Sequence, residues 1–294
     1  MKRFLQTLLA ALLLHTALVA AETRINWDSA RTICPGIKLV TVRRSSPRLI
    51  RMFIMRVDLT TPGLTFTVTG RDPDWGKPMP DYPKLPIRTR RSTTAAFMRH
   101  ARSRNLNVVV AVNASPWRPW TAPYNHKYAD PPGVNISDGV LVGNRGSDPA
   151  FVVYKDGRVD IVDKVPKKDF PKIKDALTGF CIVARNGKVL PDTHRVAKSC
   201  HPRTAYGLSA DRRYLYLMAI DGRQRHWSLG AKGSEIGTFM LEAGASDAIN
   251  MDGGGSTTMC YWDKRKKKPV MVNRQGKVGY MRSVANNLGI VIKR

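Results

Sequence analysis

The sequence predicts a single domain of the α+β class, a mixed α/β fold with a mixed β-sheet, a few helices and functional loops at strand ends. Short apolar runs of strand length recur along the chain, and many end in Gly, Asp or Asn, as strands bounded by turns do. Only two segments show helical periodicity, and each precedes an apolar strand that ends in a polar cluster. No Gly/Ser linker, internal repeat or long low-complexity run divides the chain, which favours one domain.

The two predicted helices cover residues 92–104 and 234–243. The first opens with Ser92, a residue type that caps helices, and the second has apolar residues on one side, although Gly237 weakens it. The strands "NVVVAVNASPW" and "AINMDGGGS" follow these helices, so the order of helix, strand and polar loop occurs twice. Residues 72–91 are basic and rich in Pro, and we expect them to form an exposed excursion without regular structure.

The N-terminus has the order of a secretory signal peptide. Two basic residues precede an apolar run, and small residues then lead to a cleavage point predicted before Glu22. A membrane anchor is the alternative, but the run is short, contains polar residues and has no second hydrophobic span behind it. We therefore expect a signal peptide at 1–21, a domain at 22–294, and an exported protein, periplasmic or secreted, with no transmembrane anchor after cleavage.

The chain carries a large positive charge. The formal charge of +27 falls to +25 when Lys2 and Arg3 leave with the predicted signal peptide, which holds no acidic residue. Such an excess favours polyanionic partners, namely phosphate-bearing polysaccharide, anionic lipid head groups or nucleic acid. The run "DKRKKKP", residues 263–269, is interpreted as a charged hairpin tip, with a polyanion contact as the alternative. It lacks interleaved aromatic residues and any nucleic-acid motif, so nucleic acid is not the predicted partner.

Cys34, Cys181, Cys200 and Cys260 show no spacing typical of a zinc site. In an exported chain they are interpreted as candidates for disulfides, and Cys181 with Cys200 is the first pairing we expect. None has a sequence neighbour that would activate a thiol, so a cysteine nucleophile is not predicted.

The stretch "AINMDGGGSTTM" contains a carboxylate, three glycines and then hydroxyl groups after an apolar run. A tight turn between two strands is one interpretation, because Gly pairs often join apolar segments. The other is a loop whose backbone N–H groups approach an anion, with Asp252 and Ser256 at its rim. Taken alone, the stretch favours the turn.

Three carboxylates lie close enough in sequence to share one strand–helix–strand unit. Asp221 ends a strand in "AIDGRQ", Glu235 opens the second predicted helix, and Asp252 heads the glycine run. Each has an ordinary structural explanation, as a turn residue or as a first-turn acid that complements the helix dipole. Their joint occurrence favours a site.

Several other polar residues are candidates for substrate contacts. Arg203, in "HPRTAYGLS", is a solvated cation in the ordinary interpretation and a bidentate phosphate clamp in the functional one. Asn113 and the loop "GVNISDG" lie at predicted strand ends and are also compatible with plain turns. The predicted substrate- or phosphate-binding set is Arg203, Thr204, Gly253, Gly254, Gly255, Ser256, Asn113, Ser137, Asp138 and Gly139.

An ordered series of these motifs resembles the phosphodiester glycosidase family, which includes bacterial exported proteins related to exopolysaccharide. The matching segments are "AVNASPW", "GVNISDG", "RTAYGLS", "DGRQ" with "SEIGTFML", "DAINMDGGGSTTM" and "RSVANNLGIVI". They span residues 107–292, about two-thirds of the expected mature chain, whereas residues before about 85 are not covered. Two departures concern the pocket and a helix: "NASPW" lacks the usual aromatic pair, and Gly237 stands where the family usually has Ala.

The resemblance implies hydrolysis of the bond between a sugar's anomeric carbon and a phosphodiester oxygen. It also makes the glycine loop a phosphate-facing element rather than a plain turn. We expect Arg203 and the N–H groups of residues 253–255 to hold the phosphate, and Asp252 or Asp221 to act as base or nucleophile. Glu235 would orient one of these or serve as the acid.

The substrate, the reaction and the need for a metal ion stay open at this stage. The predicted substrate is a phosphate-containing glycan of the cell surface, but a non-catalytic binder of anionic polysaccharide or nucleic acid and a transglycosylase in exopolysaccharide assembly are alternatives. No cofactor is required by the motifs. A calcium or magnesium ion bound by the carboxylates is an additional hypothesis.

Overall fold

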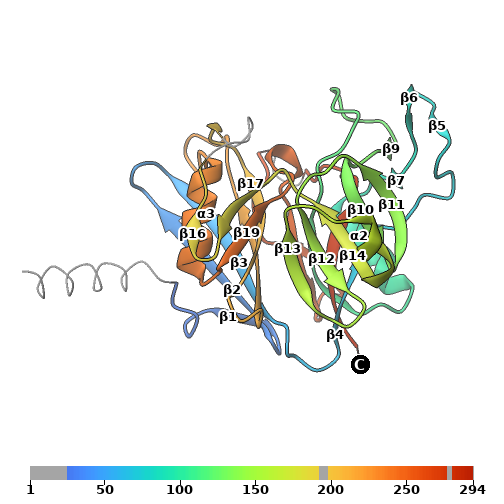
Figure 1. The fold of residues 1–294 in the computed structure, drawn as a ribbon. Coiled ribbons are helices and arrows are strands. Elements are labelled where there is room, and N and C mark those ends of the chain that lie inside the picture. The colour runs from blue at the N-terminus through green and yellow to red at the C-terminus, as the bar shows by residue number, and fades with distance from the viewer. Residues whose placement is uncertain (1–24, 192–197, 277–279, 294) are drawn as a thin grey trace, which may run out of the picture.

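The computed structural model describes residues 25–191, 198–276 and 280–293. The predicted signal peptide therefore lies outside the described residues. The described chain is mostly β with few helices, arranged around three larger sheets (Figure 1). No helix in these three ranges is long and apolar enough to cross a membrane.

The largest sheet has eight strands in the order β1-β2-β3-β18-β17-β19-β15-β16. The α-helix α3 covers one face of this sheet (Figure 1), and apolar side chains of both fill the space between them. The bounds are β1 Arg31–Cys34, β2 Ile37–Arg44, β3 Ile50–Asp58, β15 Cys181–Arg185, β16 Lys188–Val189, β17 Arg203–Leu208, β18 Tyr214–Ile220, β19 Asp247–Asn250 and α3 Gly233–Ala243.

Two five-stranded sheets pack on the other side of the main core. One has the order β21-β20-β8-β22-β4 and carries α2, and the other has the order β11-β10-β14-β12-β13. The bounds are β4 Leu64–Val68, β8 Val108–Asn113, β20 Met259–Asp263, β21 Lys268–Met271, β22 Asn287–Ile292, α2 Thr94–Ser103, β10 Gly133–Ser137, β11 Val140–Arg145, β12 Ala150–Tyr154, β13 Val159–Val162, β14 Ile173–Thr178 and the 3₁₀-helix η1 Lys167–Lys172.

The main core lies between the three sheets, where their inward-facing residues meet. Tyr206 of β17 packs edge-on against Phe151 of β12, with ring centroids 5.4 Å apart, and Phe151 contacts Phe66 of β4 in the same way. Burial of these rings draws all three sheets together because aromatic side chains remove large apolar areas from water. The core therefore fixes the ends of β8, β17 and β19 relative to one another.

Every pairing between the described strands is antiparallel, so the expected mixed sheet is wrong in this respect. The reason is visible around α3, which connects β18 to β19. A helical crossover usually joins two parallel strands that are neighbours. Here β18 and β19 run parallel to each other, but β17 lies between them and is antiparallel to both, so no parallel pair forms.

Both predicted helices are present, with bounds that differ from the prediction by at most two residues. The cap of α2 is Thr93, whose hydroxyl accepts a hydrogen bond from Ala96 N at 3.1 Å, rather than Ser92. Residues 72–91 were expected to lack regular structure, and this is wrong. They form the short pair β5 (Pro78–Met79) and β6 (Tyr82–Pro86), and β7 (Thr89–Arg90) pairs with β9 (Tyr128–Ala129). Short strands tolerate Pro at edges, where no partner needs its missing N–H.

The expected disulfide between Cys181 and Cys200 is also wrong, because Cys200 is not bonded to another described cysteine. Cys181 begins β15, whereas Cys200 immediately precedes the segment that leads into β17, and β19 lies between these two strands. Strands two places apart are separated by about 10 Å. A disulfide needs Cα atoms within about 7 Å of each other, and the two cysteines adjoin strands that are not neighbours in the sheet.

Candidate functional site

Asn113, at the end of β8, ties together the strand ends at the candidate site. Its Oδ1 accepts hydrogen bonds from Thr204 Oγ1 at 2.7 Å and from Thr258 N at 3.0 Å, and its Nδ2 donates to Asp252 O at 2.7 Å. Asn113 and Thr204 are fully buried. Their polar side-chain groups are therefore satisfied within the protein, and both residues position the main chain around Asp252 rather than present groups to a ligand.

Asp252 follows β19 and is almost completely buried, with 5% of its surface exposed. Burial raises the pKa of its carboxyl group to about 7, although Ser256, the charge of Arg282 and the N–H of Gly253 act in the opposite direction. Its Oδ2 has no well-formed hydrogen bond to any described residue. A buried carboxylate oxygen without a partner at the wall of a cavity is an unusual arrangement that a ligand or water would complete.

Close approach of neighbouring groups explains why the loop after Asp252 needs glycine. A side chain at Gly253 would place its Cβ 2.6 Å from Pro202 O, and one at Gly255 would meet the guanidinium of Arg282 at about the same distance, 2.5 Å. Gly254 has a φ of +59°, in the left-handed region, and begins the 3₁₀ turn η3 (Gly254–Ser256).

The N–H of Gly254 already donates to Pro202 O at 2.8 Å. The expected phosphate cradle of three consecutive N–H groups is therefore not formed in full, because one of them is used to hold the loop. The Ser256 hydroxyl is buried without a well-formed hydrogen bond to a described residue, as are the Thr257 hydroxyl and the indole N–H of Trp117. These groups surround the loop that carries Asp252.

Asp252 lines a cavity of about 490 Å³ between the glycine loop and the segment that follows β8. Cationic, aromatic and acidic side chains meet in it. The lining residues are Pro116, Trp117, Arg118, Trp120, Pro132, Asp148, Gly179, Phe180, His201, Arg203, Arg223, Asp252, Gly253 and Gly254.

Arg203 and Arg223 form the cationic side of this cavity. Arg203 is buried, and its guanidinium donates to Ala231 O at 2.8 Å and to Ser199 O. Arg223 is exposed and donates from Nε to Nδ1 of His201 at 3.3 Å, and no ion pair of the described residues includes it. The cavity thus contains arginine charge that can meet an anion.

His201 lies between the two arginines. Burial lowers the pKa of its imidazole, and the positive charges of Arg223 and Arg203 lower it further. The ring is therefore neutral at pH 7. Because Nδ1 accepts from Arg223, the proton of the neutral ring lies on Nε2, which makes that nitrogen a hydrogen-bond donor.

An aromatic cluster forms another wall. The Trp117 ring lies 5.0 Å from Trp120 and Trp120 lies 4.8 Å from Tyr124, measured between centroids. The Arg282 guanidinium lies 4.5 Å from the centre of the Tyr124 ring. Trp120 nevertheless has 51% of its surface exposed. An exposed indole held by two neighbouring rings offers a rigid apolar face of the kind that sugar rings stack on.

The second carboxylate of this cavity is Asp148, in the loop between β11 and β12. It is half-buried, whereas Asp252 is almost fully buried. Its side chain forms no hydrogen bond or ion pair with another described residue. Sequence reasoning missed Asp148 because nothing in "GSDPA" distinguishes it from a turn residue.

Asp221 lines a smaller adjoining cavity, of about 250 Å³, that shares Arg223 and Gly254 with the first. Its carboxylate accepts hydrogen bonds from Trp227 Nε1 at 2.7 Å, Arg274 N at 2.9 Å and Asn273 Nδ2 at 3.2 Å. Burial raises the pKa of Asp221, although these donors oppose the increase. Both carboxylate oxygens are thus occupied in holding the segment after β21.

Asp221→Asn is therefore expected to destabilise the fold much more than it impairs chemistry. The amide NH₂ would face N–H donors in a buried site, which costs about 3 kcal/mol when hydrogen bonds to a charged group are lost. Denaturant unfolding should show that loss, while the activity of each folded molecule changes by less than about threefold. A stable Asp221→Asn protein without turnover would instead place Asp221 in the chemistry.

Two other predicted groups lie outside both cavities. Glu235 accepts a hydrogen bond from Lys232 N at 2.7 Å and pairs with Arg48, so its contacts are those of a cap at the start of α3. Ser137, Asp138 and Gly139 form the tight turn between β10 and β11, with positive φ at Asp138 and Gly139. The site therefore gathers Asp252, Arg203 and the glycine loop, but not these four residues.

The fold and this cavity together define a mostly β protein with a buried aspartate beside cationic and aromatic groups. A family model for phosphodiester glycosidase matches residues 106–291, and the chain belongs to this family. No curated protein matches the chain.

Solved structures with the same fold share little sequence with this chain. The catalytic domain of zebrafish N-acetylglucosamine-1-phosphodiester α-N-acetylglucosaminidase, auto-inhibited by its pro-peptide, is 17% identical with a TM-score of 0.62, covering 90% of this chain and 86% of that one. A hypothetical protein from Synechocystis is 12% identical with a TM-score of 0.58, covering 88% and 62%. A Burkholderia pseudomallei protein described as exported is 14% identical with a TM-score of 0.56, covering 83% and 74%.

Proposed function

We propose that this protein is an exported hydrolase that cleaves the bond between a sugar's anomeric carbon and a phosphodiester, in a phosphate-linked glycan of the cell surface. One observation carries the proposal: the carboxylate of Asp252, buried and with Oδ2 unpartnered among the described residues, shares a cavity with Arg203 and Arg223. Family membership supports the reaction class. The export, periplasmic or secreted, rests on the signal-peptide pattern of the sequence.

In the proposed complex, the phosphate lies against Arg223, Arg203 and the Nε2–H of His201, and the sugar ring lies against Trp120. A phosphate ester leaves readily once its charge is neutralised, so arginines do more for this leaving group than a proton donor would. Asp148 is placed to accept hydrogen bonds from sugar hydroxyl groups.

Asp252 is the proposed general base. Its carboxylate removes a proton from water as the water oxygen bonds to the anomeric carbon. The bond from that carbon to the phosphate oxygen breaks, and its electron pair stays on the phosphate. The products are the free sugar and the phosphate monoester, so atoms and charge balance. A base with a pKa of about 7 combines a useful fraction of carboxylate with good basicity at neutral pH.

The purified mature protein is expected to release free N-acetylglucosamine and UDP from UDP-N-acetylglucosamine. In water enriched in ¹⁸O, the label should enter the sugar and not the phosphate, since the carbon–oxygen bond is the one that breaks. Release of sugar 1-phosphate and UMP would contradict the proposal, because that would be cleavage between the two phosphates.

Two further arms of this assay address the alternatives. Transfer of the sugar to an added sugar hydroxyl instead of water would identify a transglycosylase, and salt-sensitive binding without any product would identify a non-catalytic binder. The calcium or magnesium ion stays a prediction. The described residues contain no group of three or more His, Cys, Asp or Glu side chains that could hold a metal ion. Activity with chelator, and after adding back each ion, tests it.

A further inference from the structure

A second large cavity of the described residues lies away from the candidate active site. Its volume is about 790 Å³, and it is lined at the end of β8, β20 and β22 opposite to the end that meets Asp252. Asn107, immediately before β8, lines this cavity, whereas Asn113, at the end of β8, holds the main chain of Asp252. Six residues of strand span about 20 Å. The two cavities are therefore separate sites joined by rigid strands.

The lining of this cavity is strongly cationic. Arg102, Lys264, Lys267 and Lys293 contribute to it, and none of its thirteen lining residues is Asp or Glu. We call the surface around these four residues the basic groove. The three lysines take part in no ion pair of the described residues, and Asp263 beside them accepts hydrogen bonds from the backbone of Arg265 and Lys266 instead. Four like charges around a lining that contains no Asp or Glu favour a bound anion.

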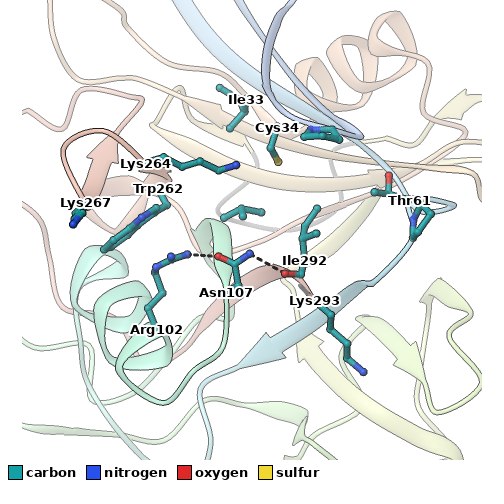
Figure 2. A pocket seen from close by; sticks show the side chains of 13 residues that line it. Ile33, Cys34, Thr61, Arg102, Asn107, Trp262, Lys264, Lys267, Ile292 and Lys293 are labelled. Atoms are coloured by element: carbon teal, nitrogen blue, oxygen red, sulfur yellow. Dashed lines mark hydrogen bonds between the residues drawn. The ribbon is translucent and has the colours of Figure 1, made fainter.

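One wall of the basic groove is rigid. Arg102 donates to Asn107 Oδ1 at 2.7 Å and to Val108 O at 2.9 Å, and Asn107 donates in turn to Ile292 O at 2.9 Å. The Arg102 guanidinium also lies 4.1 Å from the centre of the Trp262 ring. Figure 2 shows this chain of contacts from Arg102 through Asn107 to Ile292 along the cavity. The position of one cation is thus fixed before any ligand binds.

The lysines surround the rest of the cavity. Figure 2 shows Lys264 extended across it in the direction of Cys34, with Lys267 and Lys293 on opposite sides. The nearness of Lys264 to Cys34 agrees with this view, because the ammonium acts against the burial that raises the pKa of that thiol. Ile33, Val109 and Ile292 provide apolar lining between the charges. The basic groove can therefore contact both the anionic groups and the carbon skeleton of a ligand.

The basic groove extends beyond this cavity. A neighbouring hollow of about 590 Å³ shares Arg102, Asn107 and Lys293 with it. Shared lining residues place the two hollows side by side along one surface. An elongated anion fits such a shape better than a small ion does.

We propose that the basic groove is a second binding site, for a phosphate-bearing segment of the same anionic glycan chain whose sugar phosphodiester is hydrolysed about 20 Å away. The choice of this ligand class rests on the proposed function. Nucleic acid is the less favoured polyanion because the cavity has one aromatic ring, Trp262, and Arg102 already lies on it. Proteins that bind single strands stack successive bases on several rings.

The test uses the full mature protein carrying Asp252→Asn, so that binding is measured without turnover at the candidate active site. The probe is a fluorescent glycerol-phosphate oligomer, and the groove variant combines Lys264→Gln, Lys267→Gln and Lys293→Gln. The matched control combines Lys164→Gln, Lys167→Gln and Lys168→Gln, which changes the net charge equally at exposed positions elsewhere. We expect at least a tenfold weaker Kd for the groove variant alone, with a shallower dependence on salt.

Other results overturn the inference in distinct ways. Equal weakening by the control variant would show that only net charge matters. Tighter groove-dependent binding of a single-stranded DNA of equal charge would assign the groove to nucleic acid. With Asp252 intact, hydrolysis of UDP-N-acetylglucosamine should be the same in both lysine variants and the parent. That readout separates failure of the groove from failure of the proposed function.

Discussion

Asp252→Asn is expected to lower the turnover of UDP-N-acetylglucosamine by about 10³-fold, because a positioned general base contributes about 10²- to 10⁴-fold. The amide has the size of the carboxylate, and the neighbours that favour the charged carboxylate, Ser256, Trp117 and the N–H of Gly253, do not outweigh the cost of its burial. The backbone bond from Asp252 N to Ala114 O stays in place. Single-turnover measurements should therefore show intact binding and a slow chemical step.

The same substitution should stabilise the protein at alkaline pH. The pKa of Asp252 is about 7 in the folded state against an ordinary value of 3.8 for an aspartate, so folding favours the protonated form. The stability that this group contributes is present in full below pH 3.8 and is lost as pH rises to about 7, a difference of about 4 kcal/mol. Asn carries no charge, so Asp252→Asn should unfold at a higher denaturant concentration than the parent at pH 8.

The pH dependence of the rate has the opposite sign. A general base acts as carboxylate, so kcat/KM of the parent should rise with pH and level off above about 7. If kcat/KM instead falls through that range, Asp252 serves as an acid. If Asp252→Asn keeps its turnover, Asp252 is not the base. If it also shows no gain in stability at pH 8, the buried carboxylate does not destabilise the parent protein.

Local sequence patterns predicted the elements that end at the site. Strand-ending polar clusters marked Asn113 and Asp252, and the structure brings both to one point through a direct hydrogen bond. The close approach of Gly253 to Pro202 O and the left-handed Gly254 are backbone requirements that a run of three glycines signals in the sequence. Such features are local, and a sequence carries them directly.

The choice among carboxylates could not be made in the same way. Asp221, Glu235 and Asp252 all follow or begin regular elements, but the partners that occupy Asp221 and Glu235 come from Asn273, Arg274 and Arg48, which are distant in sequence. Contacts of this kind depend on how the strands pair. Asp221 and Asp252 are both buried, so hydrogen bonding separates them: Asp221 accepts from three donors, whereas Asp252 Oδ2 has no well-formed hydrogen bond to a described residue.

Arg223→Gln is expected to lower kcat/KM for UDP-N-acetylglucosamine by about 10²-fold, since removing a donor that meets developing negative charge typically costs that much. Arg223 lines both adjoining cavities, and no ion pair of the described residues holds it. It stands in "DGRQ", directly after Asp221-Gly222, where the sequence marked the strand end but not the arginine. The guanidinium should act on the departing phosphate, so kcat should fall as well as affinity.

Arg225→Gln is the matched control for this prediction. Arg225 is also exposed and lies two residues further on, but it lines neither cavity. Each substitution removes one positive charge from a protein of formal charge +27. A decrease in kcat/KM caused by the long-range electrostatic potential alone would therefore be the same in both variants. A loss confined to Arg223→Gln, with partial recovery when guanidinium is added to the buffer, places the phosphate at Arg223. Equal activities of the two variants would instead favour a phosphate position nearer Arg203 or Arg282, two arginines that approach Gly253 and Gly255.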